Sequence, residues 1–251
     1  MKKVIAANYL DSEILIDSFV NNFNSSGVLF VKGARNIIKL FDLNGAKVNV
    51  KAFKVPVIVN RLIYGTLRKS KARRSFEFAK RLGSLGIKSP MPIAYFEFSY
   101  FGMFRNSYYL SEHLDCDLTF RELTTDLNYP EHEIILRAFT RFTYDLHQKG
   151  VNFLVHSPGN TLIVKQDSSY EFYLVDLNRM KFMNMCLEKS ISNFAKLTTN
   201  KSIVKLMSDE YSKCSGKSFD VIFNLMWGKT CSFHYKHQQK KTIKKRLLFW
   251  K

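Results

Sequence analysis

The first strongly patterned part of the chain reads as β-structure. An apolar run at 28–31 is followed by an apolar-rich segment at 36–41 and by alternating polar and apolar positions at 47–53. The pair Asn44-Gly45 between the last two segments is typical of a tight hairpin turn. We therefore predict an antiparallel meander of three strands.

The spacing of apolar residues then changes from a strand period to a helix period. Between 68 and 85, apolar residues recur every three or four positions, with Glu77 on the opposite side near Arg81. Strand patterns return at 92–98 and 107–111. The predicted order is three strands, one helix and two more strands.

After Leu114 the pattern becomes mostly helical. A helix is predicted from Pro130 to Gly150, the latter placed where a helix C-cap would be. Its expected apolar stripe is formed by Ile134, Leu136, Phe139, Phe142, Leu146 and their neighbours. A short hairpin, 161–164 with 171–175, and further helices follow.

This order of elements predicts an α+β, two-lobed, protein-kinase-like fold. The N-lobe, 1–111, would hold five antiparallel strands and one helix. The C-lobe, 112–251, would be mostly helical, with the two lobes joined by a short hinge around 111–114. We find no internal repeat and no low-complexity linker in the sequence.

The most specific motif joins a turn to the end of a strand. Val155-His156-Ser157-Pro158-Gly159-Asn160 closes a Pro-Gly turn with an asparagine, and Asp176 follows sixteen residues later, after an apolar strand. Two oxygen ligands presented in this way suit the magnesium of bound ATP. The alternative is that both residues only cap backbone groups. However, a carboxylate at the end of an apolar strand is costly without a cation.

Phosphoryl transfer also needs a cation on the phosphates. Lys51, on the strand after the Asn44-Gly45 turn, is the candidate, and Glu77 is the candidate to hold it. Lys54 is the rival for Lys51, because strand alternation leaves open which lysine faces the site. Glu112, in the expected hinge, is assigned to the cofactor site with them. Taken alone, each would be an ordinary solvated residue.

The position of the usual general base carries no carboxylate. Five residues before Asn160, where an aspartate would take the acceptor's proton, the chain has Val155. The adjacent His156 has a reference pKa suited to proton transfer, but neighbours in an extended loop point in opposite directions, and a structural role is the alternative. Arg179 would contact a phosphate or pair with a loop carboxylate. Gly33 follows the first predicted strand of the meander, but no G-x-G-x-x-G motif is present.

Composition adds a partner class. The 251 residues are 46% hydrophobic, enough for a substantial core. The formal net charge of +18 predicts attraction to a polyanion such as nucleic acid, an anionic membrane or a phosphorylated glycolipid.

The four cysteines lie far apart, which indicates reduced thiols in a cytoplasmic protein without structural zinc. The N-terminus starts like a signal peptide, but Asn8 and Asp11 interrupt the apolar run. No run reaches the roughly 18 apolar residues of a spanning helix.

Two clusters hold most of the excess charge. One leads into the first predicted helix and comprises Arg61, Arg68, Lys69, Lys71, Arg73 and Arg74. The other is the segment 236–251, which contains Lys240, Lys241, Lys244, Lys245 and Arg246 and ends near Phe249 and Trp250. Basic residues beside an apolar tip suit an interfacial helix on anionic lipid, and a solvated, frayed tail is the alternative.

Together these motifs resemble the lipopolysaccharide core kinases that phosphorylate Kdo or heptose, particularly the Bacteroidetes branch. The resemblance covers roughly residues 25–185 and rests on 50–56, Tyr64, 68–75, 86–93, 107–109, 157–160 and 175–180. It implies a protein-kinase-like fold, ATP and Mg²⁺ as cofactors, and a nascent glycolipid as acceptor at the cytoplasmic face of the inner membrane. By this resemblance Lys51 would bind phosphates and pair with Glu77, and Asn160 and Asp176 would hold the metal.

The sequence departs from this family in the catalytic loop. Similar sequences read Lys-Asp-Tyr-Ser-Pro-Gly-Asn, and this chain reads Leu154-Val155-His156-Ser157-Pro158-Gly159-Asn160. Loss of a general base typically costs about 10²- to 10⁴-fold in rate. A pseudokinase that binds nucleotide or glycolipid is therefore the first alternative. A nucleic-acid-binding protein is the last, because no recognised motif supports it, and we expect no nucleic-acid partner.

Overall fold

The computed structural model describes residues 1–33, 36–54, 69–101 and 103–248, with side chains to residue 243. Several residues of the sequence motifs lie outside these ranges, namely 55–56, Arg61, Tyr64, Arg68, Phe249, Trp250 and the side chains of Lys244, Lys245 and Arg246. Two compact units are formed. The first is Met1–Asp115 with Asp176–Asn178, and the second is Cys116–Val175 with Arg179–Lys251.

The first unit is built on a six-stranded antiparallel sheet with the order β1-β5-β6-β4-β3-β2. The strands are β1 (Lys2–Ile5), β2 (Val28–Lys32), β3 (Asn36–Leu43), β4 (Ala46–Phe53), β5 (Pro92–Tyr100) and β6 (Met103–Glu112). The predicted meander and the two later strands are confirmed, and the turn between β3 and β4 has the positive φ angles that Asn44 (54°) and Gly45 (88°) tolerate. β1 is a sixth strand that the sequence did not predict, because four residues beside a leader-like start carry little pattern.

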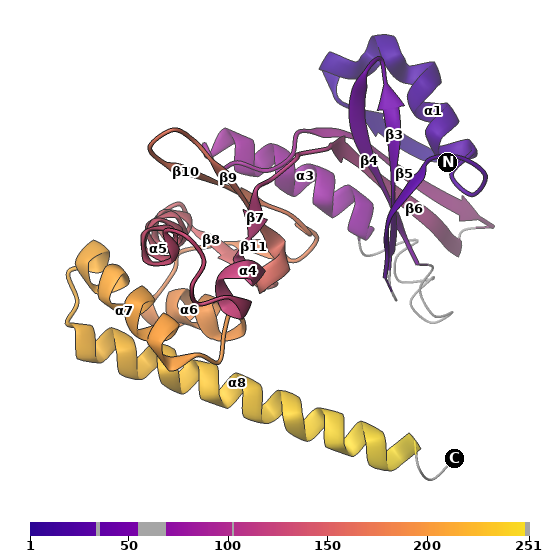
Figure 1. Cartoon of the computed structure of the whole chain (residues 1–251). Helices are drawn as coiled ribbons and strands as arrows, with labels where there is room; N and C mark the ends of the chain where they lie inside the picture. The colour runs from indigo at the N-terminus through magenta and orange to yellow at the C-terminus, as the bar shows by residue number, and fades with distance from the viewer. Residues whose placement is uncertain (34–35, 55–68, 102, 249–251) are drawn as a thin grey trace. The chain divides into compact units, whose positions relative to one another are not determined.

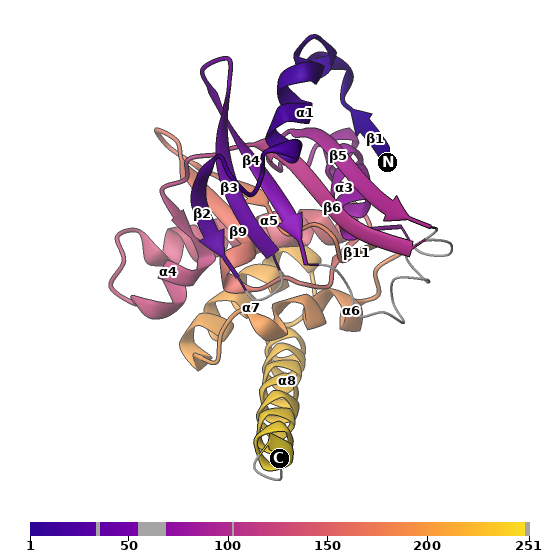
Figure 2. The same cartoon turned by 90° about the vertical axis from the view of Figure 1, so that its right-hand side faces the viewer.

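Helices cover both faces of this sheet, as Figures 1 and 2 show. The predicted helix is α3 (Lys71–Ser84), which packs Ala72 and Phe76 against Phe53, Tyr95 and Tyr109. The opposite face is covered by α1 (Glu13–Asn21), which follows the 3₁₀ turn η1 (Ala7–Ser12) and was not predicted.

The contacts of α1 explain how it is held. Its buried residues Ile16, Phe19 and Val20 pack in one cluster with Val48 and Val50 of β4. Full burial of each such side chain stabilises the fold by about 1.5–3 kcal/mol. Successive residues of β4 therefore point to opposite faces of the sheet. Val48 and Val50 face α1, and Lys51 and Phe53 face α3.

The second unit combines short strands with helices. Its strands are β7 (Leu118–Thr119), β8 (Val151–Phe153), β9 (Thr161–Lys165), β10 (Tyr170–Leu174) and β11 (Met180–Phe182), and its helices are α4 (Phe120–Thr125), α5 (His132–Gln148), α6 (Leu187–Ser192), α7 (Lys201–Ser215) and α8 (Phe219–Leu248), with 3₁₀ turns η2 (Pro158–Asn160) and η3 (Asn193–Lys196). The predicted hairpin is β9–β10, and the predicted helix is α5.

One member of the expected apolar stripe of α5 was wrong. Ile134 is 55% exposed, and its neighbour Ile135 is fully buried with Leu136 and Phe139. Because each helical residue turns by about 100°, a stripe through positions 135, 139 and 146 leaves 134 at its outer edge. Gly150 follows the helix with φ of 71°, as expected for a residue just past a helix end.

The last helix, α8, has two parts. Ile222, Met226 and Thr230 are buried, and α8 packs there against α6, α7 and η3. From Tyr235 to Ile243 every residue is exposed, and Figure 1 shows this part of α8 extending past α6 and α7. No helix among the described residues is long and apolar enough to cross a membrane.

Candidate functional site

The first unit brings Lys51 and Asp176 together. The Lys51 ammonium group donates to Oδ1 of Asp176 at 2.8 Å, across 125 residues of chain. The two side chains are 13% and 29% exposed. β4 aims Lys51 at the α3 face, and the Phe53 ring lies 5.4 Å from its Nζ atom. The pair is thus half-buried and oriented by its surroundings.

Asp176 is held in an unusual backbone conformation. Its φ of 59° lies in the left-handed region, which is uncommon for residues other than glycine and costs about 1 kcal/mol. The Nδ2 group of Asn178 also donates to Oδ1, at 2.8 Å. Strain of this kind persists where surrounding contacts fix it and is concentrated at functional sites.

The donor set around Asp176 fits Mg²⁺. Lys51 and Asn178 both donate to Oδ1 of Asp176, and within the described part of the chain Oδ2 receives no hydrogen bond. Mg²⁺ is usually held by one or two carboxylates, waters and substrate phosphates rather than by a full protein cage. That no group of three or more acidic, His or Cys ligands occurs among the described residues is compatible with this kind of site.

Glu77 has partners other than Lys51. Its carboxylate accepts from Lys69 Nζ at 2.7 Å and from Arg73 Nε at 2.8 Å. Burial alone would raise the pKa of Glu77, but these two hydrogen bonds outweigh it and lower the pKa. In the described structure the expected Lys51–Glu77 pair is not formed, because local cations occupy the carboxylate and Lys51 is bound to Asp176.

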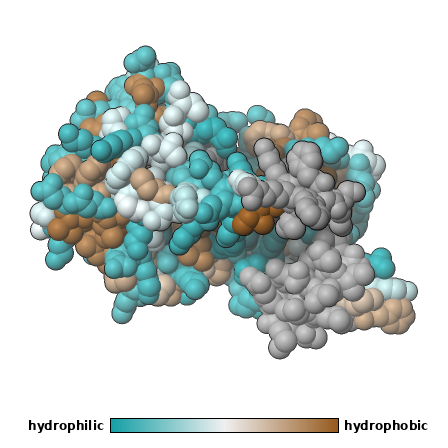
Figure 3. Space-filling view, turned by 90° about the horizontal axis from the view of Figure 1, so that it is seen from below, coloured by the Kyte–Doolittle hydropathy of each residue, from teal (hydrophilic) through white to brown (hydrophobic). Residues whose placement is uncertain are grey.

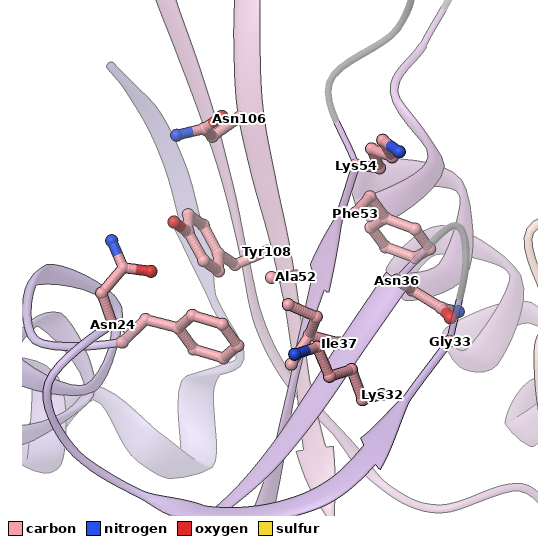
Figure 4. A pocket seen from close by; sticks show the side chains of 11 residues that line it. Asn24, Lys32, Gly33, Asn36, Ile37, Ala52, Phe53, Lys54, Asn106 and Tyr108 are labelled. Carbon is pink, nitrogen blue, oxygen red and sulfur yellow. The ribbon is translucent and has the colours of Figure 1, made fainter.

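Lys54 lies at a different place from Lys51. It lines a cavity of about 400 Å³ with Lys32, Tyr108 and other residues (Figure 4). Two further lining residues, Phe23 and Ala52, belong to the layer that packs around α1. Of the two lysines that the sequence left open, only Lys51 is bound to Asp176 in the described structure.

Glu112 is already engaged within the first unit. The Tyr9 hydroxyl donates to its carboxylate at 2.6 Å, and its carbonyl accepts from Asn49 Nδ2 at 3.3 Å. Burial, with the hydrogen bond to Glu112, raises the pKa of Tyr9. A cofactor that used these groups would have to replace both contacts.

An apolar surface lies on the same sheet face as Lys51, and no sequence motif marks it. Ile38 of β3 pairs with Lys51, and Val31 of β2 pairs with Ile38, so the three residues stand in register. Val31 is 41% exposed and Val28 is 70% exposed. A flat aromatic group bound here would cover apolar surface beside a cation.

In the second unit, the Pro-Gly turn is the 3₁₀ turn η2. Asn160 Nδ2 donates to the Val155 carbonyl at 2.7 Å, and the Asn160 carbonyl accepts from the Val175 amide at 3.0 Å. The Asn160 side chain therefore links the turn to Val155, the position where a base was expected. Val155 itself is 6% exposed.

His156 is enclosed by other rings. It is 1% exposed, and its ring centroid lies 5.2 Å from that of Phe139 and 5.4 Å from that of Phe153. Burial, with smaller effects of His147 and Lys196, lowers the pKa of His156 to about 3. The imidazole is therefore neutral near pH 7, which favours its structural role over proton transfer.

Lys196 is a residue that sequence reasoning missed. Its ammonium group donates to the Leu154 carbonyl and lies 5.6 Å from the centre of the Phe233 ring. Burial, helped by the charge of Arg179, lowers the pKa of Lys196. Arg179 is itself exposed. A lone lysine in a helical region carries no motif, so only the fold places it beside Leu154.

The basic residues differ in what they contact. Lys69 and Arg73 are paired with Glu77, whereas Lys236, Lys240 and Lys241 are exposed on α8. Seen from below, hydrophilic residues cover much of the visible surface and hydrophobic ones lie in separate patches (Figure 3). The described tail of α8 therefore offers its charges to solvent.

Comparison with solved structures identifies the fold. One solved structure, WaaP in complex with acyl carrier protein, matches 95% of this chain and 99% of that chain, with a TM-score of 0.65 and 16% sequence identity. The fold is protein-kinase-like. No protein-family model and no curated protein matches the sequence. As 987 chains of solved structures share this likeness, the match establishes the α+β fold and leaves the function to the site.

Proposed function

We propose that this chain is an ATP-dependent phosphotransferase of the lipopolysaccharide core kinase type. It transfers the γ-phosphate of ATP to a hydroxyl of Kdo or heptose at the cytoplasmic face of the inner membrane. The observation that carries the proposal is the Lys51–Asp176 ion pair at 2.8 Å. A phosphate-binding lysine and a metal-binding carboxylate are two of the groups that phosphoryl transfer requires.

Each residue then has a role in binding. Lys51 neutralises the α- and β-phosphates, and Asp176 and Asn160 would hold Mg²⁺. The metal, when bound, neutralises charge on the β- and γ-phosphates. Asn178 keeps the Asp176 carboxylate oriented, and the surface at Val31 and Ile38 receives the adenine.

Transfer in this chain relies on positioning rather than on a strong base. Val155 is apolar and His156 is buried and neutral, so neither takes the acceptor's proton efficiently near pH 7. Holding the reactants in line and neutralising charge supplies much of the rate in phosphoryl transfer. We therefore assign the protein a slow rate, lower by about 10²- to 10⁴-fold than a kinase with its base.

The absence of an acidic side chain at Val155 favours a second function. Because position 155 holds a valine instead of an acid, the chain could also be a pseudokinase that binds nucleotide or glycolipid as an interaction module. Such a protein would use all the binding groups described above and would not transfer phosphate. The two functions share ATP binding and differ only in whether a phosphate is transferred.

The membrane location rests on α8. Its exposed lysines and the basic residues that follow in the sequence suit the anionic inner-membrane surface, where the glycolipid acceptor is assembled. No membrane-spanning helix is needed for a peripheral protein of this kind.

The test is Mg²⁺-dependent ATP binding, measured by calorimetry on the full chain. Asp176→Ala should abolish it, and Asp167→Ala, on the exposed turn of the β9–β10 hairpin, should bind as the unaltered protein does. Unchanged affinity in Asp176→Ala would remove the basis of the assignment. Mass spectrometry of intact glycolipid from a deletion strain then separates the two functions, because only a kinase leaves a phosphate missing.

A further inference from the structure

A second cavity lies in the second unit beside the catalytic-loop segment. It has a volume of about 230 Å³ and is lined by β8, the residues that follow it and the end of α6 with η3, including Asn152, Leu154, His156, Ser192, Asn193 and Lys196. Leu154 and His156 flank Val155, the position of the missing base. In the proposed function, this segment would lie beside the acceptor.

Lys196 brings a fixed positive charge to this wall. Its ammonium group is held between the Leu154 carbonyl and the Phe233 ring, so its direction is defined. Arg179 is close enough to lower the pKa of Lys196 further. The described residues that line the cavity include no Asp or Glu, so an anion bound there would stabilise both cations.

His156, one of the lining residues, also carries a buried polar atom without a hydrogen-bond partner. Nδ1 of His156 makes no hydrogen bond in the described structure, although the ring is 1% exposed. Nε2 lies 3.5 Å from the Thr161 hydroxyl, which can donate to it. In that tautomer Nδ1 carries the proton, and an unmatched buried donor of this kind costs about 1–3 kcal/mol.

The remaining polar groups of the wall are preorganised. Asn193 donates to Asn152 Oδ1 at 2.9 Å and accepts from the Phe153 amide at 3.0 Å. These bonds fix β8 against η3 and leave the cavity shape set before any ligand enters. A rigid wall with one oriented cation and one free donor is suited to a small anionic group.

We propose that this cavity is a subsite for an anionic group, a phosphate or a carboxylate, carried by the acceptor sugar. Lys196 forms an ion pair with the group, and Nδ1–H of His156 donates a hydrogen bond to it. The inference rests on the proposed function for the identity of the acceptor. It gives His156 a binding role that needs no change of protonation.

The subsite would also help to position the substrate in a chain that has Val155 instead of a base. An anion anchored beside Leu154 and His156 holds the sugar next to the position where the base is missing. Because orientation can replace part of the contribution of a base, this anchor directly serves slow transfer by positioning.

The experiment uses the full chain with ¹⁵N-labelled histidine, without nucleotide. Glucose 6-phosphate, glucuronate and glucose are titrated separately while the His156 ring nitrogens are followed by NMR. At least one of the two anions should give a saturable shift of the Nδ1 signal, and neutral glucose should give none. The anion that binds identifies the source as a phosphate or a carboxylate.

Variants test the residue assignment. Lys196→Gln should lower the affinity for the anion by about ten-fold or more, as expected for loss of a charged hydrogen bond. Lys196→Arg should retain most of the affinity. Lys189→Gln, an exposed lysine of α6, is the matched control and should bind as the unaltered protein does. Thermal unfolding of each variant shows whether it is folded.

Three results would overturn the inference. They are equal shifts with glucose and the anions, no saturable shift with either anion, and unchanged affinity in folded Lys196→Gln. None of these depends on ATP, so the subsite can fail while Mg²⁺-dependent ATP binding stands. Conversely, loss of the kinase assignment through Asp176→Ala leaves the NMR titration interpretable.

Discussion

The ammonium group of Lys51 lies 2.8 Å from Oδ1 of Asp176, which neutralises both charges before any nucleotide is bound. Mg²⁺ and the phosphates of ATP would take over these charges, the metal on Asp176 and the phosphates on Lys51. In the proposed function, the ion pair is the state without nucleotide, and it holds the two groups close to each other until ATP and Mg²⁺ bind.

Replacement of Lys51 tests this relationship. We expect Lys51→Met to weaken Mg²⁺-ATP binding by about ten-fold or more, because a charged hydrogen bond to phosphate is lost. Lys54→Met is the matched control, since Lys54 lines the cavity of Figure 4 rather than contacting Asp176. Calorimetric titration of both variants measures the difference. A larger loss in Lys54→Met would assign the phosphate role to Lys54.

The strand meander could be predicted because each strand carries its own local pattern and the Asn44-Gly45 turn fixes the register. β1 could not, since Lys2–Ile5 is held by pairing with β5, whose residues lie some 90 positions further along the chain. Long-range pairing of this kind leaves little trace in local sequence.

The site shows the same division. Lys51 and Asp176 could be singled out from strand position and chain order. The expected Lys51–Glu77 pair is not formed in the described structure, because two cations close to Glu77 in sequence, Lys69 and Arg73, hold its carboxylate. Lys196 belongs to no motif and becomes visible only through its contact with Leu154.

Val155→Asp tests whether the missing base limits transfer. We expect this variant to raise the rate of sugar phosphorylation by about ten-fold or more, a small part of what a base can supply. The new carboxylate replaces a side chain that is only 6% exposed, so the variant must first be shown to fold and bind ATP. A folded variant that binds ATP and glycolipid but remains inert would favour the pseudokinase function.

His156→Ala, assayed in the same way, separates two roles of this residue. Because the buried imidazole is neutral at pH 7, we expect the pH dependence of the residual rate to stay unchanged while acceptor binding weakens. A loss of rate at saturating acceptor, with a shifted pH profile, would instead make His156 the substitute base.

The two buried histidines predict acid sensitivity of the fold. Burial lowers the pKa of His147 to about 4 and that of His156 to about 3, well below the value of about 6.5 in an unfolded chain. Between these values the unfolded state binds more protons, so stability is complete above pH 6.5 and falls as the pH decreases toward 4. Each histidine should cost about 2 kcal/mol at pH 5.

Urea unfolding at pH 7.5 and pH 5 measures this loss. In His156→Gln the difference between the two pH values should shrink by roughly half, whatever the variant does to stability at pH 7.5. A pH dependence identical to that of the unaltered protein would show that His156 is protonated as easily in the folded chain as in the unfolded one.

The tail of α8 predicts a membrane interaction that can be removed without unfolding the second unit. The last fully buried residue of α8 is Thr230, and the half-buried Phe233 and His234 also precede Tyr235, so a chain that stops at Tyr235 keeps its packed core. We expect deletion of 236–251 to weaken binding to vesicles that contain anionic lipid far more than binding to neutral vesicles. Each basic residue near an anionic surface contributes on the order of 1 kcal/mol.

Charge substitution separates electrostatic attraction from apolar insertion at the same tail. Lys240→Gln with Lys241→Gln removes two charges from an exposed helical turn and keeps its length, so affinity for anionic vesicles should fall by roughly thirty-fold at low salt. The difference from the unaltered protein should narrow as salt is raised, because the screening length shortens to about 8 Å at physiological ionic strength. Vesicle co-sedimentation at two salt concentrations measures both effects. Equal binding of the double variant and the unaltered protein would mean that the described part of the tail is a solvated end and that the acceptor is reached by another surface.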